Sequence, residues 1–128
     1  MLFDLLLTEK KDATDFGKEI IPDAIDKYKV ISYQYGGYWT DIGNIYSFFE
    51  ANLALTMDIP PFNLFDNQRM IFSRARMLPP AKISGTTITQ SLVAEGCIIH
   101  AKSIANSVIG IRSRVGAGSV LESCYAMG

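Results

Sequence analysis

Apolar and polar residues repeat with a constant spacing of 16 positions through the C-terminal part of the chain. A unit this short cannot bury an apolar face alone, so consecutive units must stack on one another. The spacing therefore predicts a solenoid. Four sets of residues keep it through three copies: Ile83, Ile99 and Val115; Ile88, Ile104 and Val120; Leu92, Val108 and Cys124; Ser91, Ser107 and Ser123.

The spacing of apolar residues within each copy indicates the kind of solenoid. They recur every five or six positions, with small residues at many corners: Ile88, Val93, Ile98, Ile104, Ile109, Val115 and Val120. Three short strands per coil fit this spacing, so we expect residues 81–128 to form a parallel β-helix of about three coils with these positions facing inward. A set of antiparallel hairpins is the alternative, which the constant register of the copies disfavours.

The first part of the chain has a mixed pattern. Leu2, Leu5 and Leu6 are spaced like the apolar stripe of an amphipathic helix, and Pro22 suits the first turn of a second helix. Polar and apolar residues alternate through KYKVISYQY, residues 27–35, which predicts a strand.

A further helix is expected after the glycine-rich turn that follows this strand. The segment NIYSFFEANLAL begins at Asn44 and places four apolar residues on one side of a helix: Ile45, Phe48, Phe49 and Leu53. The stretch 59–80 contains four prolines and no sustained period, which is typical of a connector. We therefore expect a mixed α/β region at 1–58, a connector at 59–80 and a β-helix at 81–128.

The chain's single tryptophan lies two positions from a carboxylate in the turn YGGYWTDIGN. The indole of Trp39 suits the C–H face of a sugar ring, and the carboxylate of Asp41 can accept sugar hydroxyls or help to hold a divalent cation. The structural alternative is that Asp41 caps the following helix and that Trp39 is a hydrophobic plug beneath it. One carboxylate makes a poor metal site, so a second ligand must come from elsewhere.

Two other motifs are candidates for chemistry. Asp15 and Phe16, in the tripeptide DFG, are either a polyol site at a turn or a turn cap beside a core aromatic residue. The lone histidine, His100, stands in the predicted β-helix, where acyltransferases of the hexapeptide-repeat kind keep a catalytic histidine. A solvent-facing side chain is the alternative for His100.

Basic residues gather near the start of the predicted β-helix. Arg74, Arg76 and Lys82 lie in SRARMLPPAK, and Arg112 and Arg114 lie in GIRSR. Guanidinium groups bind phosphates well, so these residues are a candidate anion site, with scattered surface arginines as the alternative.

The composition narrows the classes of partner and compartment. Of the 128 residues 48% are apolar, and 12 basic against 13 acidic residues leave a formal net charge of -1. No long run of one charge suggests a nucleic-acid or membrane face, so we expect neither partner. Cys97 and Cys124 lack the spacing of a zinc site or a disulfide framework, and Asp4 interrupts an apolar N-terminal run that has no basic segment before it. A cytoplasmic protein is the expectation.

Four motifs together resemble the glucose-1-phosphate adenylyltransferase (ADP-glucose pyrophosphorylase) family. They are DFGKEIIP, YWTDIGNIYSFFEANLAL, LPPAKI and SVIGIRSRV, in this order and spread over nearly the whole chain. The YW-x-D-I-G turn followed by EANLAL is shared among sugar-nucleotide pyrophosphorylases. DFGKEIIP together with LPP-x-K and S-V-x-G-x-R-S points to the ADP-glucose branch.

The resemblance implies a nucleotidyltransferase α/β domain followed by a left-handed β-helix. Such an enzyme joins ATP and glucose 1-phosphate into ADP-glucose and pyrophosphate for glycogen or starch synthesis. By resemblance, Asp41 is one of two carboxylates that hold Mg²⁺. The resemblance also implies that four residues border the glucose 1-phosphate pocket: Asp15, Phe16, Trp39 and Asp41.

A regulatory anion site is also implied by the resemblance. Arg76 matches a position near that site, between the two domains, and Arg74 lies beside it in the sequence. Ala75 stands where plant-like members of the family carry proline, so we assign no effector.

The family has parts that this sequence does not contain. The glycine-rich GG-x-G-x-R-L nucleotide loop, the second metal-binding aspartate and a Glu-Lys pair for the sugar phosphate are absent, so we expect the chain alone to be inactive. Two other functions stay open: a freestanding hexapeptide-repeat acyltransferase that uses His100, and a noncatalytic module that assembles through its β-helix. A homo-oligomer, joined through the β-helix or exposed strand edges, is compatible with the adenylyltransferase and the assembly module.

Overall fold

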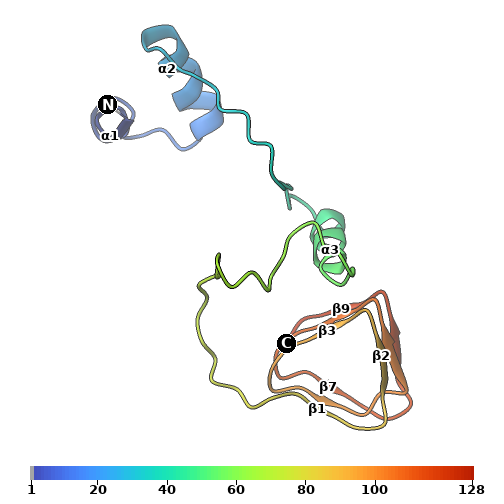
Figure 1. Cartoon of the computed structure of the whole chain (residues 1–128). Helices are drawn as coiled ribbons and strands as arrows, with labels where there is room; N and C mark the ends of the chain where they lie inside the picture. The colour runs from blue at the N-terminus through green and yellow to red at the C-terminus, as the bar shows by residue number, and fades with distance from the viewer. Residues whose placement is uncertain (1) are drawn as a thin grey trace. The chain divides into compact units, whose positions relative to one another are not determined.

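The structure is a computed structural model that describes residues 2–128, Leu2 by its backbone only. It divides into two compact units, Met1–Gly37 and Tyr38–Gly128. Helices α1 and α2 belong to the first unit, and helix α3 and the β-strands belong to the second (Figure 1).

The first unit holds two short helical segments. α1 (Leu2–Asp4) continues into a π-helical turn, η1 (Leu5–Glu9), and a second π-helical turn, η2 (Phe16–Ile20), continues into α2 (Ile21–Lys27). Leu5 and Ile20, one from each segment, are buried. The predicted apolar stripe is confirmed for Leu5, which is buried, and for Leu6, which is half-buried, whereas the side chain of Leu2 lies outside the described residues.

Pro22 lies in the first turn of α2, where the sequence predicts it. Its fixed backbone dihedral suits that turn, and its missing N–H would have no helical partner there. Polar contacts connect the C-terminal end of η1 to α2 and the residue after it: Lys10 with Asp23, Lys27 Nζ with Glu9 Oε2 at 3.6 Å, and the Tyr28 hydroxyl, which donates to Glu9 Oε1 at 3.2 Å.

The strand predicted at residues 27–35 is wrong. α2 extends to Lys27, and residues 29–43 make no backbone hydrogen bond to any described residue. The side chains of Ile31 and Tyr33 are 76% and 88% exposed. A strand is stable only when neighbouring strands pair with its N–H and C=O groups, and no segment within residues 2–128 does so here.

Helix α3 (Ile45–Ala54) begins where the sequence predicts a helix. Asn44 and Ser47 form a reciprocal capping box: the Asn44 side chain accepts from the Ser47 N–H at 2.9 Å, and the Ser47 hydroxyl oxygen accepts from the Asn44 N–H. Phe48 packs edge-on against Tyr125 of the β-helix with 5.0 Å between ring centroids. Ile45 is 87% exposed and therefore lies off the packed face. No helix in the described part of the chain is long and apolar enough to span a membrane.

The β-helix is formed by three parallel sheets with strand orders β1-β4-β7, β2-β5-β8 and β3-β6-β9. They form the three sides of a triangular coil, and α3 lies beside the side that contains β9 (Figure 1). This confirms the predicted solenoid with three strands per coil. The strands are β1 (Lys82–Ile83), β2 (Thr87–Thr89), β3 (Leu92–Val93), β4 (Ile98–Ile99), β5 (Ser103–Ala105), β6 (Val108–Ile109), β7 (Arg114–Val115), β8 (Val120–Glu122) and β9 (Tyr125–Ala126).

The core of the β-helix lies in its middle coil, which has a neighbour on both sides. Its buried members are Cys97, Ile99, Ala101, Ile104 and Ile109. Partly buried residues of the outer coils pack on them: Ala81, Ile88, Val93, Val115, Leu121 and Ala126. Ile98 is not among them. Consecutive residues of a strand point to opposite faces of the sheet, and its neighbour Ile99 is the one that enters the core.

The constant 16-residue register is confirmed as far as Val115, which pairs with Ile99, and is wrong for the rest of the last coil. Ile104 pairs with Leu121 rather than Val120, and Val108 pairs with Tyr125 rather than Cys124. The cause is one extra residue in the Gly116–Ser119 corner, whose counterparts in the first two coils are one residue shorter. Val120 is consequently 62% exposed, and Leu121 takes the inward position.

A ladder of side-chain hydrogen bonds follows the same shifted register. The Ser107 N–H donates to the Ser91 hydroxyl at 3.1 Å, and the Cys124 N–H donates to the Ser107 hydroxyl at 3.0 Å. Ser107 is fully buried, and its hydroxyl also donates to the Ala105 carbonyl at 2.6 Å. Both polar functions of this buried hydroxyl are therefore satisfied.

The residue before each ladder position has a left-handed backbone. Gln90, Asn106 and Ser123 have φ angles of 41°, 46° and 49° and occupy equivalent corners of the three coils. Ser123, predicted to stack on Ser107, instead stacks in this corner with Asn106. Few residues other than glycine and asparagine adopt such φ angles readily. In each coil a polar residue occupies this corner.

Candidate functional site

The segment that follows Gly37 lies beside helix α3. Tyr38, Thr40 and Ile42 line the clefts that this segment forms with α3. Trp39 and Asp41 line neither cleft, and the indole of Trp39 is 77% exposed. Asp41 is exposed as well. Trp39 and Asp41 are therefore two solvent-accessible residues of the same short segment.

The two structural alternatives for this pair are wrong. Asn44, and not Asp41, caps α3, because Asn44 is the residue whose backbone directly precedes the first helical turn. Trp39 is too exposed to be a plug beneath the helix. Asp41 lies beside Gly43 and has no hydrogen bond or ion pair with any other described residue. Its carboxylate is therefore available to a ligand.

Asp15 is a turn cap, as one of its two interpretations predicts. Its Oδ1 accepts the backbone N–H of Lys18 at 2.9 Å, and its Oδ2 lies 3.6 Å from Lys18 Nζ. The carboxylate of Glu19 accepts from the backbone N–H groups of Thr14 and Asp15. The carboxylates of Asp15 and Glu19 therefore both bind backbone N–H groups at the start of η2. These bonds hold the turn in which Phe16 directly follows the cap.

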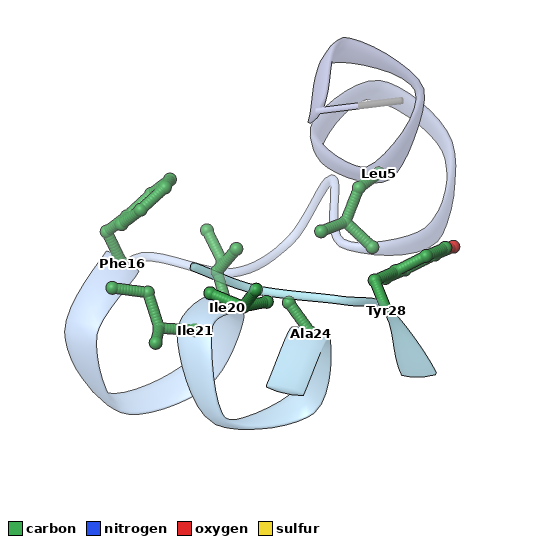
Figure 2. A pocket seen from close by; sticks show the side chains of 7 residues that line it. Leu5, Phe16, Ile20, Ile21, Ala24 and Tyr28 are labelled. Carbon is green, nitrogen blue, oxygen red and sulfur yellow. The ribbon is translucent and has the colours of Figure 1, made fainter. Parts of the chain in front are cut away.

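Phe16 is not a core residue, because its side chain is 48% exposed. It borders an apolar cavity of about 250 Å³ with Ile20, Ile21 and Ala24 on one side and Leu5 and Tyr28 on the other (Figure 2). Its lining is almost wholly hydrocarbon, since the hydroxyl of Tyr28 donates to Glu9. Such a cavity has no hydrogen-bond donor or cation for a phosphate group. Phe16 lies at its edge and is accessible to solvent.

The candidate residues thus fall into two pairs. Asp15 and Phe16 belong to the unit Met1–Gly37, and Trp39 and Asp41 belong to the unit Tyr38–Gly128. Within each pair, a polar group and an aromatic ring are presented on the same short segment.

The described residues do not form a metal site by themselves. No cluster of three or more His, Cys, Asp or Glu side chains occurs among residues 2–128. Proteins commonly bind Mg²⁺ through one or two carboxylates together with substrate phosphates and water. Asp41, exposed and without a hydrogen bond or ion pair to any other described residue, fits one ligand position of such a site.

Arg74 and Arg76 line one groove of about 510 Å³ between the segment Ser73–Leu78 and the β-helix. The structure brings these two arginines together, as the anion-site interpretation requires, whereas Lys82 and Arg114 lie on the sheet either side of Ile98. Glu95 also lines the groove, and the sequence analysis missed it. The repeat contains the necessary signal, because Glu95 lies 16 positions before Ile111, which lines the same groove.

His100 lies at an exposed corner directly after β4. Its backbone N–H donates to the Val115 carbonyl at 2.9 Å, and its imidazole has no partner among the described residues. A general base is oriented by a neighbouring group, and none of the described residues makes a hydrogen bond to the His100 ring.

Comparison with known families assigns both parts of the chain. Residues 1–58 match the nucleotidyl transferase family, and residues 76–128 match the GLGC left-handed parallel β-helix domain. The chain joins nucleotidyl transferase sequence to a GLGC β-helix. This combination is consistent with ADP-glucose pyrophosphorylase and agrees with the three parallel sheets in register. The GLGC match also gives the hand of the coil, which is left-handed as expected.

The family matches and the contacts divide the chain at different places. α3 lies inside the nucleotidyl transferase match but packs on β9 of the GLGC β-helix. The contact-based boundary falls earlier, at Gly37. The limits of 1–58, 59–80 and 81–128 remain a prediction.

Proposed function

We propose that the chain is part of a glucose-1-phosphate adenylyltransferase, which makes ADP-glucose and pyrophosphate from ATP and glucose 1-phosphate for glycogen or starch synthesis in the cytoplasm. The nucleotidyl transferase and GLGC β-helix matches support this proposal. The observation that carries it to a site is the exposure of Trp39 and of Asp41, whose carboxylate has no hydrogen bond or ion pair with any other described residue.

In this proposal Trp39 and Asp41 form one wall of the glucose 1-phosphate pocket. The indole stacks on the C–H face of the glucose ring, and the Asp41 carboxylate either accepts glucose hydroxyls or serves as a Mg²⁺ ligand. Phe16, directly after the Asp15 cap, presents an exposed aromatic ring within the first unit.

The chemistry assigns a positioning task to these residues. A phosphate oxygen of glucose 1-phosphate attacks the α-phosphorus of ATP, and pyrophosphate leaves. Bound Mg²⁺ offsets the negative charge on the phosphates in such reactions. Trp39 and Asp41 orient the sugar so that its phosphate has a defined direction of attack, and this lowers the entropic part of the barrier.

The chain by itself is proposed to be inactive. Its sequence contains no glycine-rich loop to hold the nucleotide phosphates, and its described residues contain no cluster of three or more His, Cys, Asp or Glu side chains that could hold a metal ion. The chain should therefore produce no ADP-glucose when incubated with ATP, glucose 1-phosphate and Mg²⁺.

We also propose that the groove at Arg74 and Arg76 binds a regulatory anion. Two guanidinium groups attract a phosphorylated or carboxylated effector, and the carboxylate of Glu95 reduces the net positive charge. Glu95→Gln should accordingly tighten the binding of inorganic phosphate, and Arg76→Ala should weaken it.

Assembly through the β-helix is a second, compatible proposal. The outer strands β1, β2 and β3, and likewise β7, β8 and β9, have a paired strand on one side only. Free N–H and C=O groups on such edges can pair with another copy of the chain. Sedimentation equilibrium over a range of concentrations should show a mass above that of a monomer, and a constant monomer mass would reject this proposal.

Isothermal titration calorimetry tests the proposed site. The chain should release or absorb saturable heat with glucose 1-phosphate and Mg²⁺, and Asp41→Asn should abolish it. Asp58→Asn is the matched control, because Asp58 is also exposed but lies beyond α3. Equal titration curves for Asp41→Asn and the unchanged chain would remove Asp41 from the site.

A further inference from the structure

Two neighbouring grooves run along α3 and share the side chains of Glu50 and Ala54. The first, of about 340 Å³, is lined by Tyr38 and Tyr46, and the second, of about 420 Å³, reaches from α3 to the β-helix. Both volumes fall in the range of roughly 300–1,000 Å³ that is usual for small-molecule sites. We call this joint surface, which lies within the second unit, the α3 groove.

The β-helix side of the α3 groove is the ladder of left-handed corners. Gln90, Asn106 and Ser123 all line it, one from each coil. Adjacent parallel strands lie about 4.8 Å apart, so polar side chains recur along the groove at that interval. None of these side chains, nor that of Glu50, has a hydrogen-bond partner elsewhere in the described chain, so all can bind a ligand.

The chemistry of the lining selects a class of ligand. Amide and hydroxyl groups both donate and accept hydrogen bonds, and the Glu50 carboxylate accepts them. None of the described residues that line either groove is lysine or arginine, so a phosphate or carboxylate ligand would meet Glu50 without a compensating cation. The exposed ring of Tyr46, beside Tyr38, adds aromatic faces that suit the C–H side of sugar rings.

We propose that the α3 groove binds a neutral oligosaccharide. Sugar rings lie against Tyr38 and Tyr46, and their hydroxyls bond to Glu50 and to the ladder of Gln90, Asn106 and Ser123. A chain of sugar rings repeats its hydroxyl groups, as the ladder repeats its polar side chains. This site differs from the proposed glucose 1-phosphate wall, because neither Trp39 nor Asp41 lines either of its grooves.

Calorimetric titration of the whole chain with maltoheptaose and with cellohexaose tests the proposal. Asn106→Gly removes the central amide while keeping a residue that tolerates a positive φ, and Tyr46→Ala removes an exposed ring. Each should raise the Kd at least about tenfold, the effect of losing roughly 1.4 kcal/mol of contact energy. Arg112→Gly, at a left-handed corner outside the groove, and Tyr33→Ala, in the first unit, are the matched controls and should leave the Kd unchanged.

The outcomes separate this proposal from its competitors. Saturable binding of either saccharide that depends on Asn106 and Tyr46 supports it, and a preference between the two would identify the glycosidic linkage. Absence of saturable binding, equal weakening by the control variants, or binding of spermidine in place of both saccharides would overturn it. Asp41→Asn should leave oligosaccharide binding intact, so failure of the proposed glucose 1-phosphate site would not affect this result.

Discussion

At the scale of single residues, hydrogen bonding decides which polar groups are structural and which are available. Ser107 is buried and uses both its donor and its acceptor, whereas Asp41 is exposed and its carboxylate accepts no hydrogen bond from any described residue. Asn44 takes the capping position that Asp41 was a candidate for. Because the cap lies three positions after Asp41, the Asp41 carboxylate is available for ligand binding.

Ser107→Ala should destabilise the β-helix by about 1–3 kcal/mol, because it leaves the Cys124 N–H without its acceptor, while the Ala105 carbonyl keeps the N–H of Ser123. Urea unfolding followed by circular dichroism measures the change. Ser84→Ala is the control, since the exposed Ser84 hydroxyl makes no such bond in the described structure. A loss no larger than that of the control would contradict the role of the ladder.

The ion pair between Lys10 and Asp23 predicts a pH dependence for the first unit. The hydrogen bond from Lys10, and then its charge, lower the pKa of Asp23 from the ordinary 3.8. A lowered folded pKa stabilises the unit above pH 3.8, and this contribution disappears as the pH falls through the folded pKa. The ion pair is exposed, so the effect should be small.

Asp23→Asn tests this pH dependence. NMR signals of Leu5 and Ile20 during urea unfolding report the first unit alone. The variant should be less stable than the unchanged chain at neutral pH and should approach it under strong acid. Parallel stability curves across the whole pH range would contradict the assignment.

At the scale of elements, the local signals predicted most of the architecture. The capped helix at residues 45–54 and the three-stranded coils follow from patterns that each segment carries by itself. The strand at 27–35 failed because strand formation depends on a partner, which the alternating pattern of one segment does not supply.

The register shift in the last coil could not be read from periodicity. β8 has apolar residues at both Val120 and Leu121, so a register of 16 or of 17 positions places an apolar side chain inward. Only the extra residue in the Gly116–Ser119 corner decides between them, and corners tolerate changes in length.

Leu121→Ala should therefore cost more stability than Val120→Ala. Leu121 contacts the core, and its truncation should cost about 2 kcal/mol, near the lower end for a buried leucine because it is half-buried. Val120 is 62% exposed, and its truncation should cost less than about 0.5 kcal/mol. Urea midpoints of the two variants decide the register, and the reverse order would restore the constant spacing of 16 positions.

At the scale of the whole molecule, the candidate residues are distributed over two units. Asp15 and Phe16 were predicted from one motif and Trp39 and Asp41 from another, and each pair is held by its own local structure. The sequence alone revealed these motifs through the family resemblance. It did not reveal the α3 groove, because Asn106 is far in the sequence from Tyr46 and Glu50 and shares no motif with them.

The Trp39–Asp41 face is the surface that we propose to recognise a sugar phosphate. Because Trp39 is the only tryptophan, its fluorescence reports this face alone. Titration with glucose 1-phosphate in the presence of Mg²⁺ should change the emission saturably, and Asp41→Asn should abolish the change, while inorganic phosphate should have no effect. Emission that does not respond to glucose 1-phosphate, or that responds equally to inorganic phosphate, would contradict the claim.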